Sequence, residues 1–106
     1  MTSEQIQKLL AEGEGLTLEF KKCVNELSSS VFETVCAFSN RYGGHILLGI
    51  DDSGTIIGVN PDAVFSMKKN FINMLNNPQK ISPPLLLELE EINIDGKIVL
   101  HVYIPN

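Results

Sequence analysis

Apolar and polar residues alternate with two different periods along the 106-residue chain, which predicts a mixture of helices and strands. Residues 2–12 are expected to form a helix, because Thr2 and Gln5 have the spacing of a capping box. The apolar residues that share one face of this helix are Ile6, Leu9 and Leu10. Residues 16–21 alternate strictly and predict a strand. Its apolar side consists of Leu16, Leu18 and Phe20.

Two further helices follow from the apolar period of three to four residues. The first begins at Ser30, which has capping-box spacing to Glu33, and its buried face is expected to hold Val31, Val35 and Phe38. The second covers residues 61–76, with Asn60 as N-cap and Pro61 in the first turn. Its expected stripe comprises Val64, Phe65, Lys68, Phe71, Ile72 and Leu75.

The segment between these two helices, residues 38–59, predicts a helix end, a strand and a hairpin. Asn40 and the pair Gly43 and Gly44 tolerate the left-handed backbone conformations that end helices. Residues 46–48 form an apolar strand that closes at Gly49, where a side chain would obstruct whatever approaches the backbone. The acidic turn at residues 51–54 is expected to lead into a second strand that ends near residue 59.

The last third of the chain predicts a β-hairpin, with strands over residues 85–94 and 97–104. Asp95 and Gly96 suit a type I′ turn, which needs positive φ at both positions. Counting outward from this turn places Glu90 opposite His101. Near Glu91 the apolar positions shift from odd to even numbers, which predicts a bulge or a stretch buried on both sides. The complete pattern predicts an α+β fold: a single mixed or mostly antiparallel sheet of four to five strands, packed with two to three helices and ending in the hairpin.

The composition, 43% hydrophobic and 20% charged residues, is typical of a globular protein of one domain. The N-terminus lacks the pattern of a secretory signal, and no apolar run approaches the length that spans a bilayer, so we expect a cytoplasmic protein without a membrane partner. Cys23 and Cys36 belong to no cluster of ligands and are expected to be reduced. His45 and His101 are expected to have structural roles.

The formal net charge of −5 argues against a non-specific nucleic-acid binder, but it leaves room for a local basic patch. Candidate cations are Lys21, Lys22, Arg41, Lys68 and Lys69, for which ordinary surface solvation is the alternative. Tyr42 follows Arg41 at the helix end, where it suits either stacking on a base or covering the edge of the sheet.

Two segments together carry a family resemblance: EGLTLEFKK at residues 14–22 and FETVCAFSNRYGGHILLGIDDSGTIIGV at residues 32–59. They resemble the AlbA-like DNA-binding domain of bacterial transcriptional regulators and Schlafen proteins, a domain once labelled a divergent AAA ATPase. The resemblance covers almost the whole chain. It implies that residues 1–106 form a single AlbA-like domain, the N-terminal part of a longer regulator with further C-terminal domains. It also implies that nucleic acid, most simply DNA, is the partner.

The ATPase label can be tested against the residues. A phosphate-binding P-loop needs G-x-x-x-x-G-K-[ST], whose Lys pairs with the phosphates. Gly44 and Gly49 have the glycine spacing, but Ile50 and Asp51 follow in place of Lys and Ser or Thr. We therefore expect no nucleotide hydrolysis and no nucleotide cofactor.

The resemblance to Schlafen proteins with nuclease activity also implies a cluster of carboxylates that binds metal. The matching positions are Glu14, Glu19 and Asp52, with Asp51 as the competitor for the last role. Such a cluster suits Mg²⁺ or Mn²⁺, which stabilise charge on a phosphoryl group in transit. The alternative is that Glu14 and Glu19 are solvated surface residues and that the two aspartates are ordinary turn residues.

Three hypotheses from different classes result. The first is a nucleic-acid-binding regulatory module in which Lys21, Lys22, Asn40 and Arg41 contact phosphate, and Gly43 and Gly44 let the backbone approach closely. The second is a metal-dependent nuclease that uses the carboxylate cluster. The third is a module that forms a homodimer or docks a partner through an exposed edge of the final hairpin.

Overall fold

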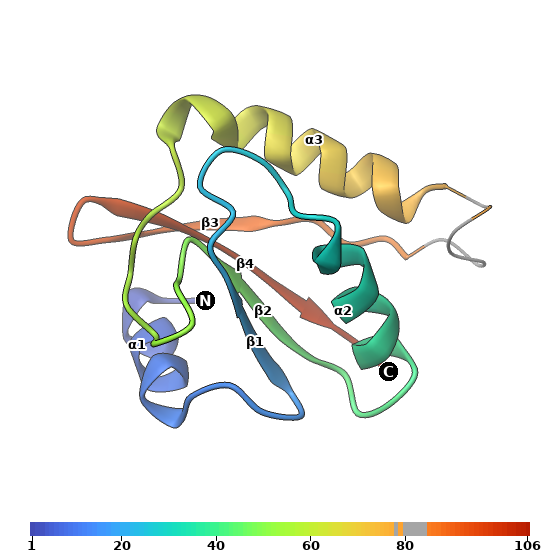
Figure 1. The fold of residues 1–106 in the computed structure, drawn as a ribbon, viewed down its shortest axis with the longest axis horizontal. Coiled ribbons are helices and arrows are strands. Elements are labelled where there is room, and N and C mark those ends of the chain that lie inside the picture. The colour runs from blue at the N-terminus through green and yellow to red at the C-terminus, as the bar shows by residue number, and fades with distance from the viewer. Residues whose placement is uncertain (78, 80–84) are drawn as a thin grey trace.

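A four-stranded sheet lies at the centre of the computed structural model, which describes residues 1–77, 79 and 85–106 (Figure 1). The strands are β1 (Leu18–Lys21), β2 (Gly44–Leu48), β3 (Glu90–Ile94) and β4 (Lys97–Ile104), and their order in the sheet is β1-β2-β4-β3. β1 runs parallel to β2, whereas the other pairs are antiparallel. The predicted single mixed sheet and its final hairpin are confirmed.

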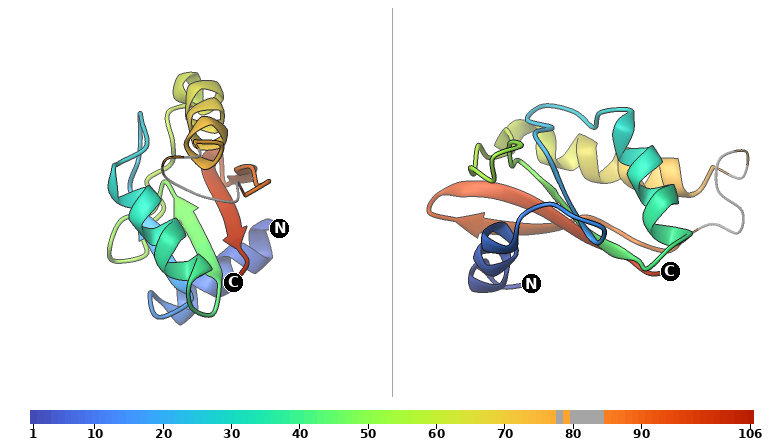
Figure 2. Two further views of the ribbon diagram at one scale, coloured as in Figure 1. Left: turned by 90° about the vertical axis from the view of Figure 1, so that its right-hand side faces the viewer. Right: turned by 60° about the horizontal axis from the view of Figure 1, so that its bottom comes forward.

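Helices cover both faces of this sheet, as the two further views in Figure 2 show. α1 (Ser3–Glu12) lies on one face, while α2 (Ser30–Ser39) and α3 (Val64–Leu75) lie on the other. A short 3-10 turn, η1 (Pro61–Ala63), precedes α3. Two apolar cores result, because alternate residues of β2 point to opposite faces: Ile46 and Leu48 pack with α2 and α3, and Leu47 packs with Ile6 of α1. No described helix is long and apolar enough to cross a membrane.

Two of the three predicted helix caps are confirmed. Gln5 N donates to Thr2 Oγ1 at 3.1 Å, and Thr2 N donates to Gln5 Oε1 at 2.8 Å, which completes the capping box. Asn60 Oδ1 likewise accepts from Asp62 N at 3.0 Å. The capping box of Ser30 is wrong, because Ser29 is the N-cap and makes no side-chain capping bond.

The final hairpin turns at Asp95 and Gly96, whose φ values of 51° and 82° fit the predicted turn. Glu90 pairs with His101, as counted from this turn. The strand predicted from residue 85 is wrong in its first half, because β3 begins only at Glu90. The shift of the apolar phase has a physical reason: Leu89 packs in the core below α2 and α3, whereas Ile92 and Ile94 pack in the core below α1.

The predicted second strand after the acidic turn is also wrong. Residues 55–59 form only isolated bridges, from Ile56 to Ile50 and from Val59 to Ile98. The reason is that Gly49 and Gly58 have positive φ, 92° and 88°, and interrupt the extended backbone on both sides of the turn. The backbone of Gly49 is approached closely by Ile98 and Val59. A Cβ on Gly49 would lie 3.1 Å from Ile98 O and 3.2 Å from Val59 N.

The expectations for four residues are corrected by burial and backbone geometry. Leu16 lies outside β1 and is 67% exposed, because the chain turns before Leu18. Phe65 is 79% exposed, and Met67 takes its place in the buried stripe of α3, which also includes Val64, Phe71 and Leu75. Ile72, which lies beside that stripe, is exposed as well. Asn40 has a φ of −89° and is not left-handed; Gly43, with a φ of 76°, takes that conformation.

Candidate functional site

The predicted site residues lie along the β1 edge of the sheet, beside α2. Leu18 and Phe20 of β1 pack on the side of α1, so the alternation of the strand directs Glu19 and Lys21 to the side of α2. Glu19 lines a hollow of about 310 Å³, which we call the Glu19 hollow. Its other lining residues are Gly15, Leu16, Glu33, Thr34, Ala37, Phe38 and Arg41.

The carboxyl groups of Glu14 and Glu19 are close together. The hydrogen bond with Glu14 is the largest of the causes that raise the pKa of Glu19 to about 7. Partial burial and the charge of Glu14 raise the pKa further, Asp52 adds a weaker effect, and Lys21 opposes them. The neutral form of the Glu19 carboxyl is therefore favoured up to about neutral pH. The structure thus brings together two of the predicted acidic residues.

Asp51 has the role of an ordinary turn residue. Its Oδ1 accepts hydrogen bonds from Ser53 N at 3.0 Å, Ser53 Oγ at 2.6 Å and Thr55 N at 2.9 Å. The bond from Ser53 Oγ is the main cause that lowers the pKa of Asp51, and the bond from Thr55 N adds to it. Asp52 is exposed and, with Asp51, Lys22 and Ser53, lines a separate hollow of about 530 Å³.

The acidic residues fit a metal ion only in part. Oxygen donors such as the carboxylates of Glu14 and Glu19 are those that Mg²⁺ and Mn²⁺ prefer. However, residues 1–77, 79 and 85–106 contain no group of three or more His, Cys, Asp or Glu side chains placed to hold a metal. Asp52 contributes its charge to the pair without joining it.

The predicted lysines differ in whether their ammonium groups are already bonded within the chain. Lys21 Nζ donates to Ser30 Oγ at 2.9 Å, so its ammonium group is tied to the start of α2. Lys68 forms an ion pair of 3.5 Å with Glu91. Lys22 and Lys69 are exposed, and Lys22 lies just after the end of β1. Of the lysines at the β1 edge, Lys22 is therefore the more available for a ligand.

Residues 40–42 form an exposed corner at the end of α2. The backbone of Asn40 closes the helix by donating to Cys36 O at 3.1 Å, and Gly43 N donates to Phe38 O at 2.8 Å. With Leu16, the side chains of Asn40, Arg41 and Tyr42 line a hollow of about 490 Å³, the Tyr42 hollow. It adjoins the Glu19 hollow, because Leu16 and Arg41 line both.

Gly43 and Gly44 are explained by internal packing. Both are buried, and a Cβ on Gly43 would lie 2.6 Å from Ile104 O. A Cβ on Gly44 would lie 2.8 Å from the ring of Phe38 and from Thr17 O. The chain itself occupies the space beside these glycines, so we leave them out of the nucleic-acid contacts proposed below.

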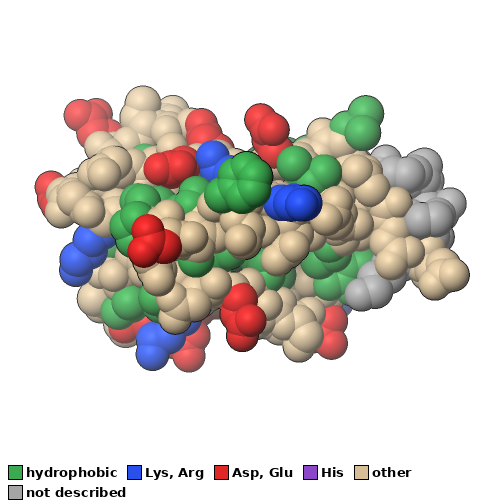
Figure 3. All heavy atoms as spheres, turned by 90° about the horizontal axis from the view of Figure 1, so that it is seen from above, with side chains coloured by type: hydrophobic (Ala, Val, Ile, Leu, Met, Phe, Trp, Pro, Cys, Tyr) green, Lys and Arg blue, Asp and Glu red, His purple; other side chains and the backbone are tan. Residues whose placement is uncertain are grey.

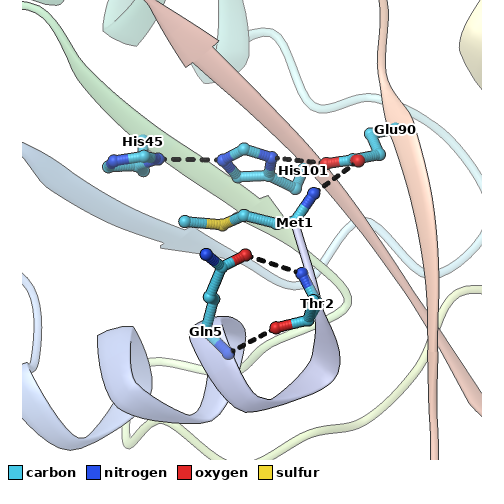
Figure 4. Close-up of polar contacts among 6 residues, drawn as sticks. All are labelled: Met1, Thr2, Gln5, His45, Glu90 and His101. Atoms are coloured by element: carbon cyan, nitrogen blue, oxygen red, sulfur yellow. Dashed lines mark hydrogen bonds and ion pairs between the residues drawn. The ribbon is translucent and has the colours of Figure 1, made fainter.

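A further set of polar residues lies on the α1 side of the sheet (Figure 4), and the sequence pattern predicted only its pairing of Glu90 with His101. His45 Nδ1 and His101 Nε2 are 2.9 Å apart, and His101 Nδ1 lies 3.1 Å from Glu90 Oε1. The amino group of Met1 lies 2.5 Å from Glu90 Oε2. Burial is the main cause that lowers the pKa of both histidines. The pairing of Glu90 with His101 across the hairpin was the sequence signal that could have revealed this set. The hydrogen bonds of the set support a structural role for both histidines.

The surface charge is mixed. Figure 3, which looks onto the molecule from the top of Figure 1, shows single basic side chains and scattered acidic ones on this face. The whole chain contains 8 Lys and Arg against 13 Asp and Glu, so a ligand with phosphate groups would have to use a few selected cations.

The fold of this chain is similar to that of a solved structure. The structure is that of the N-terminal domain of the "Putative ATP-dependent DNA Helicase RecG-related Protein" from Nitrosomonas europaea. The two share 28% sequence identity with a TM-score of 0.68, over 98% of this chain and 72% of that one.

Sequence comparisons identify the family. The chain is 32% identical over 101 residues to "Uncharacterized ATP-binding protein UU034" from Ureaplasma parvum serovar 3. The match covers 86% of this chain and 28% of that relative, so this chain spans only about a quarter of the relative's length. The sequence model of the family described as Schlafen, AlbA_2 matches residues 14–106. This range contains both the acidic pair and the corner at residues 40–42, and the chain therefore belongs to the Schlafen, AlbA_2 family.

Proposed function

We propose that this chain is the DNA-binding module of a transcriptional regulator. Its family and its likeness to a domain of a protein named as a DNA helicase support a nucleic-acid-associated role. The observation that carries the proposal is the corner at residues 40–42. There Arg41 is exposed beside a hollow and, among the described residues, forms no ion pair.

The proposed path of the nucleic acid follows the β1 edge. Arg41 lies just before β2, near the start of its parallel neighbour β1, and Lys22 lies just after the end of β1. Arg41 suits a phosphate because its guanidinium group donates two parallel hydrogen bonds, and Asn40 adds an amide that can donate or accept. Lys21 contributes charge from its position beside Ser30.

Arg41→Ala, measured by fluorescence anisotropy with a labelled DNA, tests this proposal. Loss of the guanidinium group is expected to weaken binding about tenfold, since a hydrogen bond to a charged group contributes about 1.5 kcal/mol or more. Lys8→Ala is the matched control, because Lys8 is an exposed cation on α1, on the other face of the sheet. Equal affinities of Arg41→Ala and the wild type would refute the proposed contact.

A second candidate function is favoured by the raised pKa of Glu19. We propose as the alternative that Glu14 and Glu19, with Asp52 nearby, hold Mg²⁺ or Mn²⁺ and that the chain cleaves nucleic acid. The metal, when bound, would stabilise charge on the phosphoryl group. The acidic pair lies between the proposed phosphate contacts at Arg41 and Lys22, so a strand along the β1 edge would pass it.

Incubation of RNA and single-stranded DNA with each metal, beside a Glu19→Ala variant, distinguishes this alternative. Cleavage by the wild type that is lost in the variant would support it. No cleavage, or equal cleavage by the variant, would remove it, while the DNA-binding proposal would stand on the anisotropy result alone.

A further inference from the structure

Two large side chains stand out at the Tyr42 hollow because they are not used in the core. Tyr42 is 68% exposed and Leu16 is 67% exposed. Both come from segments that connect regular elements. In the part of the chain that the structure describes, Tyr42 makes neither a ring contact nor a side-chain hydrogen bond. The fold therefore leaves an aromatic face available beside Arg41 and Asn40.

The charges around this hollow disfavour a ligand that is held mainly through phosphates. Glu19 and Glu33 line the adjoining Glu19 hollow, and the net charge of the chain is −5. Of the cations at this edge, Lys21 is already bonded to Ser30. A duplex presents two strands of phosphates and keeps its bases stacked inside, so it would gain little from Tyr42.

A single strand gains more from the same residues. Its unstacked bases have exposed ring faces, and stacking of a base on an aromatic side chain stabilises such complexes without regard to sequence. An arginine beside the ring pairs with the phosphate that follows the base. Carboxylates in the adjoining hollow accept hydrogen bonds from the amino groups of bases rather than repel them.

We propose that the Tyr42 hollow binds an unstacked base of a single-stranded nucleic acid. The base stacks on Tyr42 and contacts Leu16, Arg41 pairs with the adjacent phosphate, and Asn40 bonds the edge of the base. This inference rests on the proposed nucleic-acid function and specifies the class of nucleic acid that the site selects.

The test compares four ligands by fluorescence anisotropy with the complete chain: single-stranded DNA, single-stranded RNA of the same sequence, and the blunt duplex of each. We expect at least one single strand to bind about tenfold more tightly than its duplex. Preference for DNA or for RNA identifies the sugar that the site accepts, and either preference supports the inference. A duplex that binds as tightly as its single strands would overturn it.

Three variants then test the role of Tyr42. Tyr42→Ala is expected to weaken single-strand binding about fivefold or more, whereas Tyr42→Phe retains it, because stacking needs the ring and not the hydroxyl group. Phe65→Ala is the matched control, since Phe65 is an aromatic residue on α3 that is at least as exposed as Tyr42. Unchanged binding by Tyr42→Ala, or an equal loss with Phe65→Ala, would overturn the inference.

Different results would refute the nucleic-acid function and the preference for single strands. If no single strand or duplex binds, the proposed function itself is refuted. If the duplexes bind and Tyr42→Ala has no effect, the nucleic-acid function stands and only the single-strand inference is refuted. Circular dichroism and thermal unfolding of each variant verify that a loss of binding is not a loss of folding.

Discussion

At the residue scale, the carboxyl group of Glu19 links the candidate site to pH. Its pKa is raised to about 7 in the folded chain, against about 4.5 for the free group, mainly through the hydrogen bond with Glu14. The folded state therefore binds the proton more tightly than the unfolded state does. The resulting stabilisation is complete below pH 4.5 and is lost as the pH rises through about 7.

Glu19→Gln is expected to remove this pH dependence, because the amide keeps the hydrogen bond and cannot ionise. The measurement is the free energy of urea unfolding at pH 5, 6, 7 and 8 for the wild type and the variant. Only the difference between the two is informative, since both histidines also respond in this range. Glu33→Gln, a change at an exposed residue of the same hollow, is the control. A variant that loses stability with pH as steeply as the wild type would contradict the account.

The hydrogen bonds of Glu90 and the two histidines predict which nitrogen of each ring carries the proton. The bonds from the amino terminus and from His101 lower the pKa of Glu90, so its carboxylate is ionised and accepts from His101 Nδ1. His101 Nε2 is then free to accept from His45 Nδ1. Long-range ¹H–¹⁵N NMR at pH 7.5 is expected to show both protons on Nδ1. A proton on Nε2 of either ring would refute this arrangement.

The same set also makes an acid-sensitive contribution to stability. Burial is the main cause that lowers the pKa of His101 below its usual value of 6.5, whereas the bond to Glu90 acts in the opposite direction. Because the folded pKa is lowered, this contribution is present above pH 6.5 and is lost as the pH falls through the folded value. Glu19 and His101 therefore give pH dependences of opposite sign.

At the element scale, the sequence pattern located most elements, and the errors arise where contacts distant in sequence decide the structure. The capping box at Thr2, the Asp95–Gly96 turn and the buried face of α2 depend on neighbouring residues, so they could be predicted. The missing strand after Asp51 depends on Gly49 and Gly58, which have positive φ and lie close to Ile98 and Lys97, residues distant in sequence. Such long-range contacts leave no period in the sequence.

The turn from α2 into β2 tolerates no side chain at Gly43. Gly43→Ala is expected to destabilise the fold by about 2 kcal/mol or more, because the Cβ would meet Ile104 O at 2.6 Å and alanine disfavours positive φ. Gly96→Ala is the matched control: its φ is 82°, but nothing lies within 4 Å of the added Cβ, so a loss of only about 1 kcal/mol is expected. Equal losses of unfolding free energy in urea would show that packing at Gly43 is not the reason for the glycine.

The site was only partly predictable for a related reason. The family resemblance implies that Glu14 and Glu19 belong to one cluster, and the structure places these two carboxyl groups near each other. Whether Asp52 joins them depends on how the loop after β2 is held, and Asp51 holds that loop through Ser53 and Thr55. The exposure of Tyr42 and Leu16 follows from the packing of the whole sheet, so neither side chain could be assigned to a hollow beforehand.

At the scale of the whole molecule, β3 is an edge of the sheet and offers a surface for a second copy. Self-association through this edge remains a proposal, and it makes a prediction about salt. The chain has a net charge of −5, so screening of the repulsion between two copies is expected to favour pairing. Sedimentation of the 11.7-kDa chain at high concentration measures it: a monomer at low and high salt would rule out the dimer.

Binding of nucleic acid has the opposite salt dependence, and the whole-molecule charge limits its size. Lys22 and Arg41, with Lys21 as a third contact, would neutralise about two to three phosphates, which for a single strand predicts a slope of log affinity against log salt of about −1.4 to −2.1. The few available cations therefore predict a moderate slope and not the steep one of a basic protein.

The most direct test of nucleic-acid binding at the β1 edge is the affinity of the complete chain for single-stranded DNA and RNA between 50 and 300 mM salt. We expect saturable binding that weakens about 10- to 40-fold over this range, with a shallower slope for Arg41→Ala. An affinity that stays constant from 50 to 300 mM, or no binding at 50 mM, would contradict the claim that Arg41 and its neighbours at the β1 edge contact nucleic acid.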